Sequence, residues 1–168
     1  TAIGPGAMYQ TTDGDFNVAV GHNALYNIQN HYNTAIGRQA GQSSITGTNN
    51  ASLGYNAQPP SNSSSNNVTL GDASIGALRC NQTSITSLSD ARDKTEVVDL
   101  PIGLDFLDKI RPVKFKWQRR EPDNHDGLTR AGFIAQELQT AQKDLDYLNL
   151  IDDDNPDKLE AKQGNLIP

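Results

Sequence analysis

The sequence predicts two unlike halves: an all-β coiled repeat of β-helix or β-roll type in residues 1–88, and an α+β domain with a strand hairpin and helices in residues 89–168. Three observations predict this division. A glycine-centred motif recurs five times in the first half, and helix and strand spacings replace it in the second. Residues 1–88 carry two basic and three acidic residues, whereas residues 89–168 carry 12 basic and 17 acidic ones. The composition shift predicts a domain boundary near residue 88.

The repeat consists of an aliphatic residue, a glycine and a small residue three positions later. Successive glycines are 17, 16, 17 and 17 residues apart, and an asparagine stands four positions before each of the last four. This spacing predicts five coils, each with a short strand and a glycine turn. The coils lie near residues 1–16, 17–32, 33–49, 50–66 and 67–88. We expect the aliphatic residues to point inward as the repeat core: Ile3, Val20, Ile36, Leu53 and Leu70.

One aliphatic residue per 16 or 17 positions is too little to give a single chain a core. Apolar burial contributes about 25 cal/mol per Å², against an ordering cost of about 1.5 kcal/mol per residue. We therefore expect identical chains to share the core, and a threefold axis suits short coils around a common apolar centre. The repeats resemble the heads of trimeric autotransporter adhesins and the repeats of phage tail fibres. The alternative is a polar linker with accidental glycines.

The second half has the spacing of an α+β domain. Residues 101–110 place Leu104 and Leu107 on one helical face, and Pro112 ends the helix. Apolar and polar residues then alternate over residues 113–118, as in a half-buried strand. We expect a hairpin turn, a partner strand and a second helix at residues 121–127, 128–134 and 135–142.

The chemical motif lies at the junction, in Ser89-Asp90-Ala91-Arg92-Asp93-Lys94. A serine can act as nucleophile, with the lysine five residues later as general base, if the segment bends to bring the amine to the hydroxyl. The alternative is a solvated turn, or a helix N-cap at Ser89, with Arg92 and Lys94 exposed.

This hexapeptide, together with residues 103–117, residues 132–138 and the final Leu-Ile-Pro, resembles the endosialidase-type intramolecular chaperone family. That family forms the C-terminal domains of phage tailspikes, tail fibres and neck appendages. The resemblance covers residues 89–168. It implies a homotrimeric chaperone that assists folding of the preceding fibre and is then released by autoproteolysis between Leu88 and Ser89.

The resemblance also implies residue roles. Ser89 is expected to be the nucleophile and Lys94 its proton acceptor, a Ser-Lys dyad that acts once per chain rather than with turnover. Asp90 and Arg92 match the motif in supporting roles. Two features depart from the family, because Gln163 replaces its usual tyrosine and the family continues beyond the Leu-Ile-Pro into a long helix. We expect the sequence to be part of a longer protein. If the long helix is needed to place Lys94, a chain without that helix is expected to stay uncut between Leu88 and Ser89.

Further expectations concern partners and location. Neither half has the basic excess that attracts nucleic acid, and no run approaches the roughly 20 apolar residues of a membrane span. One cysteine, Cys80, and three scattered histidines predict no metal site, and no cofactor is expected. The resemblance implies a virion protein assembled in the host cytoplasm, with binding of a host-cell surface receptor by the fibre left open.

Two other functions stay open. The first is a permanent structural or adhesive trimer in which Ser89 is only a turn residue and no cleavage occurs. The second is a hydrolase that acts on outside substrates, although no His-Asp set or metal constellation accompanies Ser89.

Overall fold

The computed structural model describes residues 1–81, 88–118 and 127–166, which fall into two compact units. The first unit combines Thr1–Ile75 with Asp152–Glu160, and the second combines Gly76–Ile151 with Ala161–Pro168. These limits differ from the expected boundary near residue 88. The first unit ends earlier and also takes in a segment that is distant in sequence, which a composition shift cannot register.

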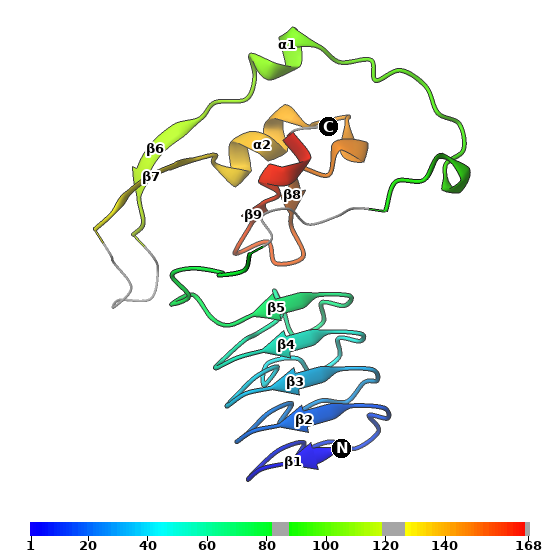
Figure 1. Ribbon diagram of the computed structural model, residues 1–168, viewed down its shortest axis with the longest axis vertical. Helices are drawn as coiled ribbons and strands as arrows, with labels where there is room; N and C mark the ends of the chain where they lie inside the picture. Colours follow the sequence, from blue (N-terminus) through cyan, green and yellow to red (C-terminus); the bar gives the residue numbers. More distant parts are fainter. Residues whose placement is uncertain (82–87, 119–126, 167–168) are drawn as a thin grey trace. The chain divides into compact units, whose positions relative to one another are not determined.

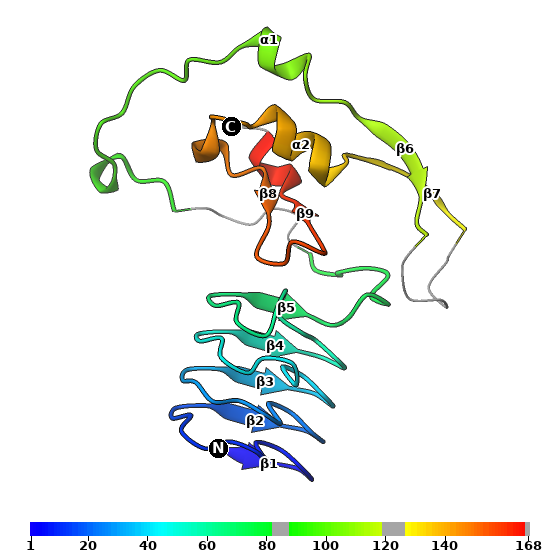
Figure 2. The same ribbon diagram turned by 180° about the vertical axis from the view of Figure 1, so that it is seen from behind.

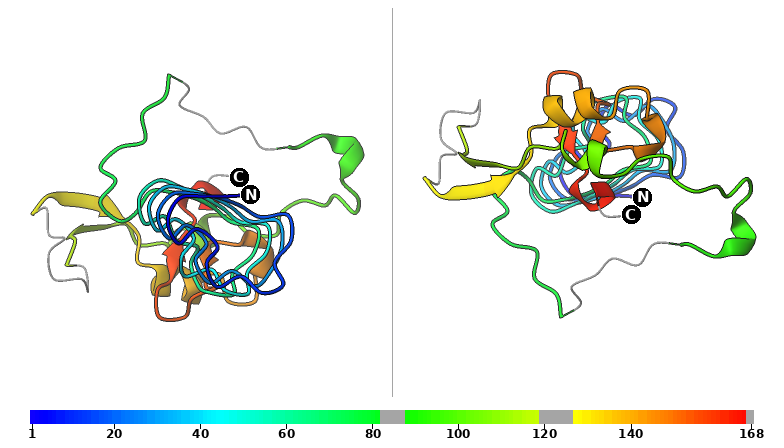
Figure 3. Two further views of the ribbon diagram at one scale, coloured as in Figure 1. Left: turned by 90° about the horizontal axis from the view of Figure 1, so that it is seen from below. Right: turned by 90° about the horizontal axis from the view of Figure 1, so that it is seen from above.

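The first unit contains a stack of five short parallel strands, one per coil (Figure 1). The strands pair in chain order, and each residue pairs with the residue one repeat later in the sequence. The middle residues Ala19, Ala35 and Ser52 therefore lie side by side. Figures 2 and 3 show this stack from behind and along its axis, where the coils overlie one another. The strands are β1 (Ala2–Ile3), β2 (Val18–Val20), β3 (Thr34–Ile36), β4 (Ala51–Leu53) and β5 (Val68–Leu70).

Small and polar side chains fill the coils at the strands, where the buried residues are Ala19, Ala35 and Ser52. The expectation that the aliphatic residues point inward is therefore wrong for the single chain. A strand sends alternate side chains to opposite faces, so a buried middle residue places its neighbours outside. Val20 is half-buried, and the other four aliphatic side chains are exposed: Ile3 by 59%, Ile36 by 46%, Leu53 by 38% and Leu70 by 48%.

A ladder of asparagines joins neighbouring coils. The side-chain oxygen of Asn33 accepts a hydrogen bond from the Asn50 backbone N–H at 3.0 Å, and its amide nitrogen donates to the Gly47 carbonyl at 3.0 Å. Asn17 and Asn50 accept equivalent bonds from the next ladder residue at 2.8 and 3.0 Å. A buried amide is tolerated only when its polar atoms are paired. This requirement explains why asparagine recurs four positions before each of these glycines.

The glycine after each strand allows the coils to approach closely. Gly37 has φ +136°, and a Cβ atom there would lie 2.4 Å from the carbonyl oxygen of Gly54 in the next coil. We expect Gly37→Ala to lower the free energy of unfolding by about 3 kcal/mol, because it combines backbone strain with a backbone clash. Thermal unfolding measures the change. Gly76→Ala is the control, because a Cβ there meets nothing within 4 Å, and equal midpoints for the two variants would contradict the prediction.

The second unit holds short helices and a hairpin (Figure 1). Strands β6 (Val113–Lys116) and β7 (Thr129–Gly132) pair antiparallel, with Val113 opposite Gly132. Within the expected hairpin turn, residues 121–126 lie outside the described residues. Helix α1 spans only Leu104–Leu107, shorter than expected, because the backbone after it makes tighter bonds three residues apart, from Lys109 to Phe106 and from Ile110 to Leu107. The other elements are η1 (Ala91–Asp93), α2 (Ala135–Ala141), η2 (Asp146–Leu148), β8 (Ile151–Asp152), β9 (Glu160–Ala161) and η3 (Gln163–Leu166).

The core of the second unit forms around α2. Leu138 and Ala141 of this helix are buried in one cluster with three residues from other segments, namely Phe106, Leu150 and Ile151. Outside the cluster, the Arg111 guanidinium donates two hydrogen bonds to the Glu137 carboxylate, one of them at 3.1 Å. This ion pair ties the segment before β6 to α2.

Candidate functional site

The junction motif forms a tight turn around η1. Asp90 is the N-cap, because its carboxylate accepts a hydrogen bond from the Arg92 backbone N–H at 2.9 Å. The alternative in which Ser89 caps the helix is therefore wrong, since Ser89 lies one residue before the cap. An aspartate directly before a helical turn is a recognisable capping signal that the sequence reasoning missed.

The Arg92 side chain returns to the same carboxylate. Its guanidinium donates to Asp90 at 3.0, 3.2 and 2.6 Å, so that both carboxylate oxygens are paired. These side-chain bonds, followed by the backbone bond from Arg92, hold the pKa of Asp90 below its ordinary value, and Asp90 in turn raises the pKa of Arg92. A lowered carboxyl pKa means that the pair is present at neutral pH and is lost only as the pH falls through that lowered value.

The turn brings Ser89 and Lys94 together. Lys94 is the C-cap residue in extended backbone geometry, and its Nζ donates a hydrogen bond to Ser89 Oγ at 2.6 Å. The contact lies within the hydrogen-bond reach that a serine nucleophile and its general base require. Ser89, Asp90, Arg92 and Lys94 thus lie in one turn, with the two charged supporting residues paired to each other.

The bond before Ser89 is openly accessible. The Leu88 side chain is 100% exposed, and every residue from 88 to 101 is exposed. Attack on a carbonyl is accelerated most when preorganised donors stabilise the oxyanion away from water. The single chain leaves Ser89, Lys94 and the bond after Leu88 in water, so efficient attack on that bond would require a further surface.

Metal and membrane features are absent from the part of the chain that the structure describes. Within residues 1–81, 88–118 and 127–166, no three His, Cys, Asp or Glu residues form a group that could hold a metal ion. No helix among those residues has the length and apolar character needed to cross a bilayer.

Comparison with known proteins finds a family match over the segment that contains Ser89 and Lys94. Residues 89–147 match the model of the peptidase S74 family, described as the chaperone of endosialidase. Neither the curated proteins nor the solved structures contain a match to the chain.

Proposed function

Residues 89–147 carry a domain of the chaperone-of-endosialidase family, and from this premise we propose that the chain is the C-terminal part of a phage-type tail fibre, spike or appendage. Residues 89–168 drive trimerisation and folding of the repeat half and are then released by autoproteolysis between Leu88 and Ser89. The observation that carries the cleavage step is the 2.6 Å contact between Lys94 Nζ and Ser89 Oγ within the family match. The product is a virion fibre, assembled in the host cytoplasm.

The bonds that break and form belong to this turn and to one water molecule. Ser89 Oγ attacks the Leu88 carbonyl carbon through a five-membered ring, and its proton passes to neutral Lys94 Nζ. The tetrahedral intermediate then expels the Ser89 nitrogen, which takes the proton back from Lys94. The resulting ester joins Leu88 to Ser89 Oγ. Water adds to this ester, giving a carboxyl group on Leu88 and restoring the Ser89 hydroxyl beside a new amino terminus.

The exposed aliphatic residues support the trimer. We call Ile3, Val20, Ile36, Leu53 and Leu70 the aliphatic stripe, because the five stand opposite one another in register across β1 to β5. Four of the five are exposed in the single chain. Continuous apolar surface of this kind is uncommon on monomers and marks interaction sites. The expectation that one chain has no core is wrong, because Leu25 and Ile28 are buried with four alanines inside the coils of the single chain. Further copies of the same chain, packed stripe to stripe around a threefold axis, would bury the stripe and add a shared core to this small one.

The open position of the dyad links cleavage to assembly. Water surrounds Ser89 and Lys94 in a single chain, since all residues from 88 to 101 are exposed. A neighbouring copy that covers this turn would exclude water and complete the site. Cleavage would then follow trimer formation, which leaves the finished fibre kinetically trapped once its chaperone is gone.

The chaperone role is tested by producing residues 1–88 alone and the complete chain as an uncut Ser89→Ala variant. We expect about tenfold less trimer from residues 1–88, because a trimeric domain raises the effective concentration of the strands it joins. Size-exclusion chromatography with light scattering measures the yield. The control is residues 1–88 obtained by cutting the assembled trimer after Leu88. This fragment should remain trimeric, because the chaperone is needed to form the trimer and not to keep it. Equal trimer yields from residues 1–88 and the complete chain would refute the chaperone role.

The second candidate is a permanent structural or adhesive trimer. The full exposure of Leu88 and of the residues after it favours this candidate, because an unshielded dyad is a poor catalyst. A permanent trimer would keep one continuous chain through Ser89 after assembly.

A further inference from the structure

A segment near the C-terminus forms part of the repeat unit. Residues 152–160 group with Thr1–Ile75, although they follow most of the chaperone half in sequence. Asn155 Nδ2 donates a hydrogen bond to the Pro60 carbonyl at 2.9 Å, across 95 positions of the chain. Its side-chain oxygen accepts a bond from the Asp157 N–H at 3.1 Å. Asn155 therefore shapes a turn of its own segment and fastens that turn to the fourth coil.

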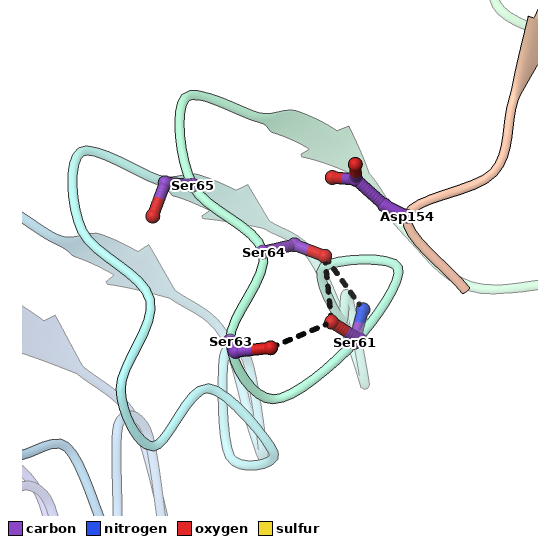
Figure 4. Close-up of a pocket in the computed structure, with 5 residues that line it drawn as sticks. All are labelled: Ser61, Ser63, Ser64, Ser65 and Asp154. Atoms are coloured by element: carbon purple, nitrogen blue, oxygen red, sulfur yellow. Dashed lines mark hydrogen bonds between the residues drawn. The ribbon is translucent and has the colours of Figure 1, made fainter. Parts of the chain in front are cut away.

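Two hollows are lined jointly by this segment and the last coils. Figure 4 shows Asp154 beside the loop of Ser61, Ser63, Ser64 and Ser65, around a pocket of about 330 Å³. Ser64 is buried, and its hydroxyl lies 2.8 Å from that of Ser61. The second pocket, of about 300 Å³, is lined from the segment by Asp152, Lys158 and Glu160 and from the coils by residues 58–60 and 67–70. The segment thus covers the end of the stack at β5.

The end of the stack needs such a cover. Among the described residues, β5 is the last strand of the parallel sheet and pairs only with β4. An open strand edge offers unpaired backbone groups to other chains and invites aggregation unless a loop covers it. Residues 152–160 lie against this end of the stack, where three of them line a pocket with residues 67–70. They also carry charged side chains, which discourage edge pairing.

We propose that residues 152–160 are a detachable cap on the end of the coil stack, bound to the fourth coil through Asn155, and that the two pieces stay together after the chain is cut between Leu88 and Ser89. The cap lies C-terminal to that cut, so it belongs to the leaving piece. Cutting and release are then separate steps, and release exposes the end of the stack. The position of the cut rests on the proposed function, whereas the cap does not.

The cap is tested by hydrogen exchange on the complete chain with Ser89→Ala, which keeps it whole. Asn155→Asp retains the acceptor for Asp157 but cannot donate to Pro60, and Asn155→Ala removes both bonds. The Asn66 amide donates to the Thr48 carbonyl of the third coil, and the Gly71 amide donates to the Leu53 carbonyl of the fourth. We expect each variant to speed exchange of these two amides about tenfold, because they belong to the end of the stack that the cap covers. Asn165→Asp is the matched control, because its Nδ2 donates to the Asn149 carbonyl at 2.7 Å in the other unit. Unchanged exchange in both Asn155 variants would overturn the cap.

Retention is tested without relying on self-cleavage. A protease recognition sequence inserted between Leu88 and Ser89, where Leu88 is fully exposed, lets an added protease open the chain. We expect the pieces to co-elute in size-exclusion chromatography, and Asn155→Asp to speed their separation about tenfold relative to Asn165→Asp. Immediate separation of the pieces, or equal rates in the two variants, would overturn retention. If the chain without the inserted sequence never cuts itself, the proposed autoproteolysis is refuted. The cap and its retention are not affected by that result.

Discussion

A Ser89→Ala chain is expected to stay whole under native, trimeric conditions in which the parent is cut between Leu88 and Ser89. Alanine has no oxygen to attack the Leu88 carbonyl, so no ester forms and no other described group replaces Ser89 Oγ in this turn. Intact mass of the protein measures the outcome. The parent should give one piece ending at Leu88 and one beginning at Ser89. A parent that stays whole as a trimer would remove the catalytic role of Ser89 and favour the permanent trimer.

Variants of Lys94 test its role as general base separately from the role of Ser89 as nucleophile. Lys94→Met should slow cleavage by about 10²–10⁴-fold, the usual contribution of a positioned general base. Lys94→Arg should be as slow, because a guanidinium stays protonated and cannot accept the serine proton. Ser74→Ala and Lys109→Met are matched controls, because both residues are exposed and lie outside the turn. Cleavage of Lys94→Met at the parent rate would show that another group accepts the proton.

The register of the coils could be predicted because particular residues are chemically required at each step. Buried asparagine side chains satisfy backbone groups of the next coil, and a Cβ on Gly37 would meet the backbone of Gly54. Both requirements place the same residue type, asparagine or glycine, at regular intervals, and this periodicity can be read from the sequence. The meeting of Ser89 with Lys94 could likewise be anticipated, since it needs only one turn between residues that are five apart.

Other features left no such mark in the sequence. The direction of Ile36 depends on which face of its strand turns to the coil interior. That interior holds Ala19, Ala35 and Ser52 at the strands, with Leu25 and Ile28 buried in the turn after β2. The contact between Asn155 and Pro60 joins residues 95 positions apart, and no periodicity or composition reports such a pair. Long-range contacts of single polar residues are therefore found only when the chain is seen folded.

An Ile36→Asp chain is expected to lose the trimer. Ile36 stands in the middle of the aliphatic stripe, between Val20 and Leu53 in register, and is 46% exposed in the single chain. In a shared core, three aspartates would meet near the axis without partners, and burial of an unpaired charge costs several kcal/mol. The expected molar mass by light scattering is that of one chain, where the parent gives three.

The control for this substitution is Thr46→Asp, which adds the same charge to the same coil at an exposed position away from the stripe. It should keep the parent mass, as should Ile36→Leu, which preserves apolar volume. Circular dichroism separates loss of the trimer from loss of the coils themselves. If Ile36→Asp kept the mass of three chains, the stripe would lie outside the interface, and the apolar surface of β1 to β5 would require another partner. If it gave single chains and the two controls did not, the stripe would be the shared core on which folding of the repeat half depends.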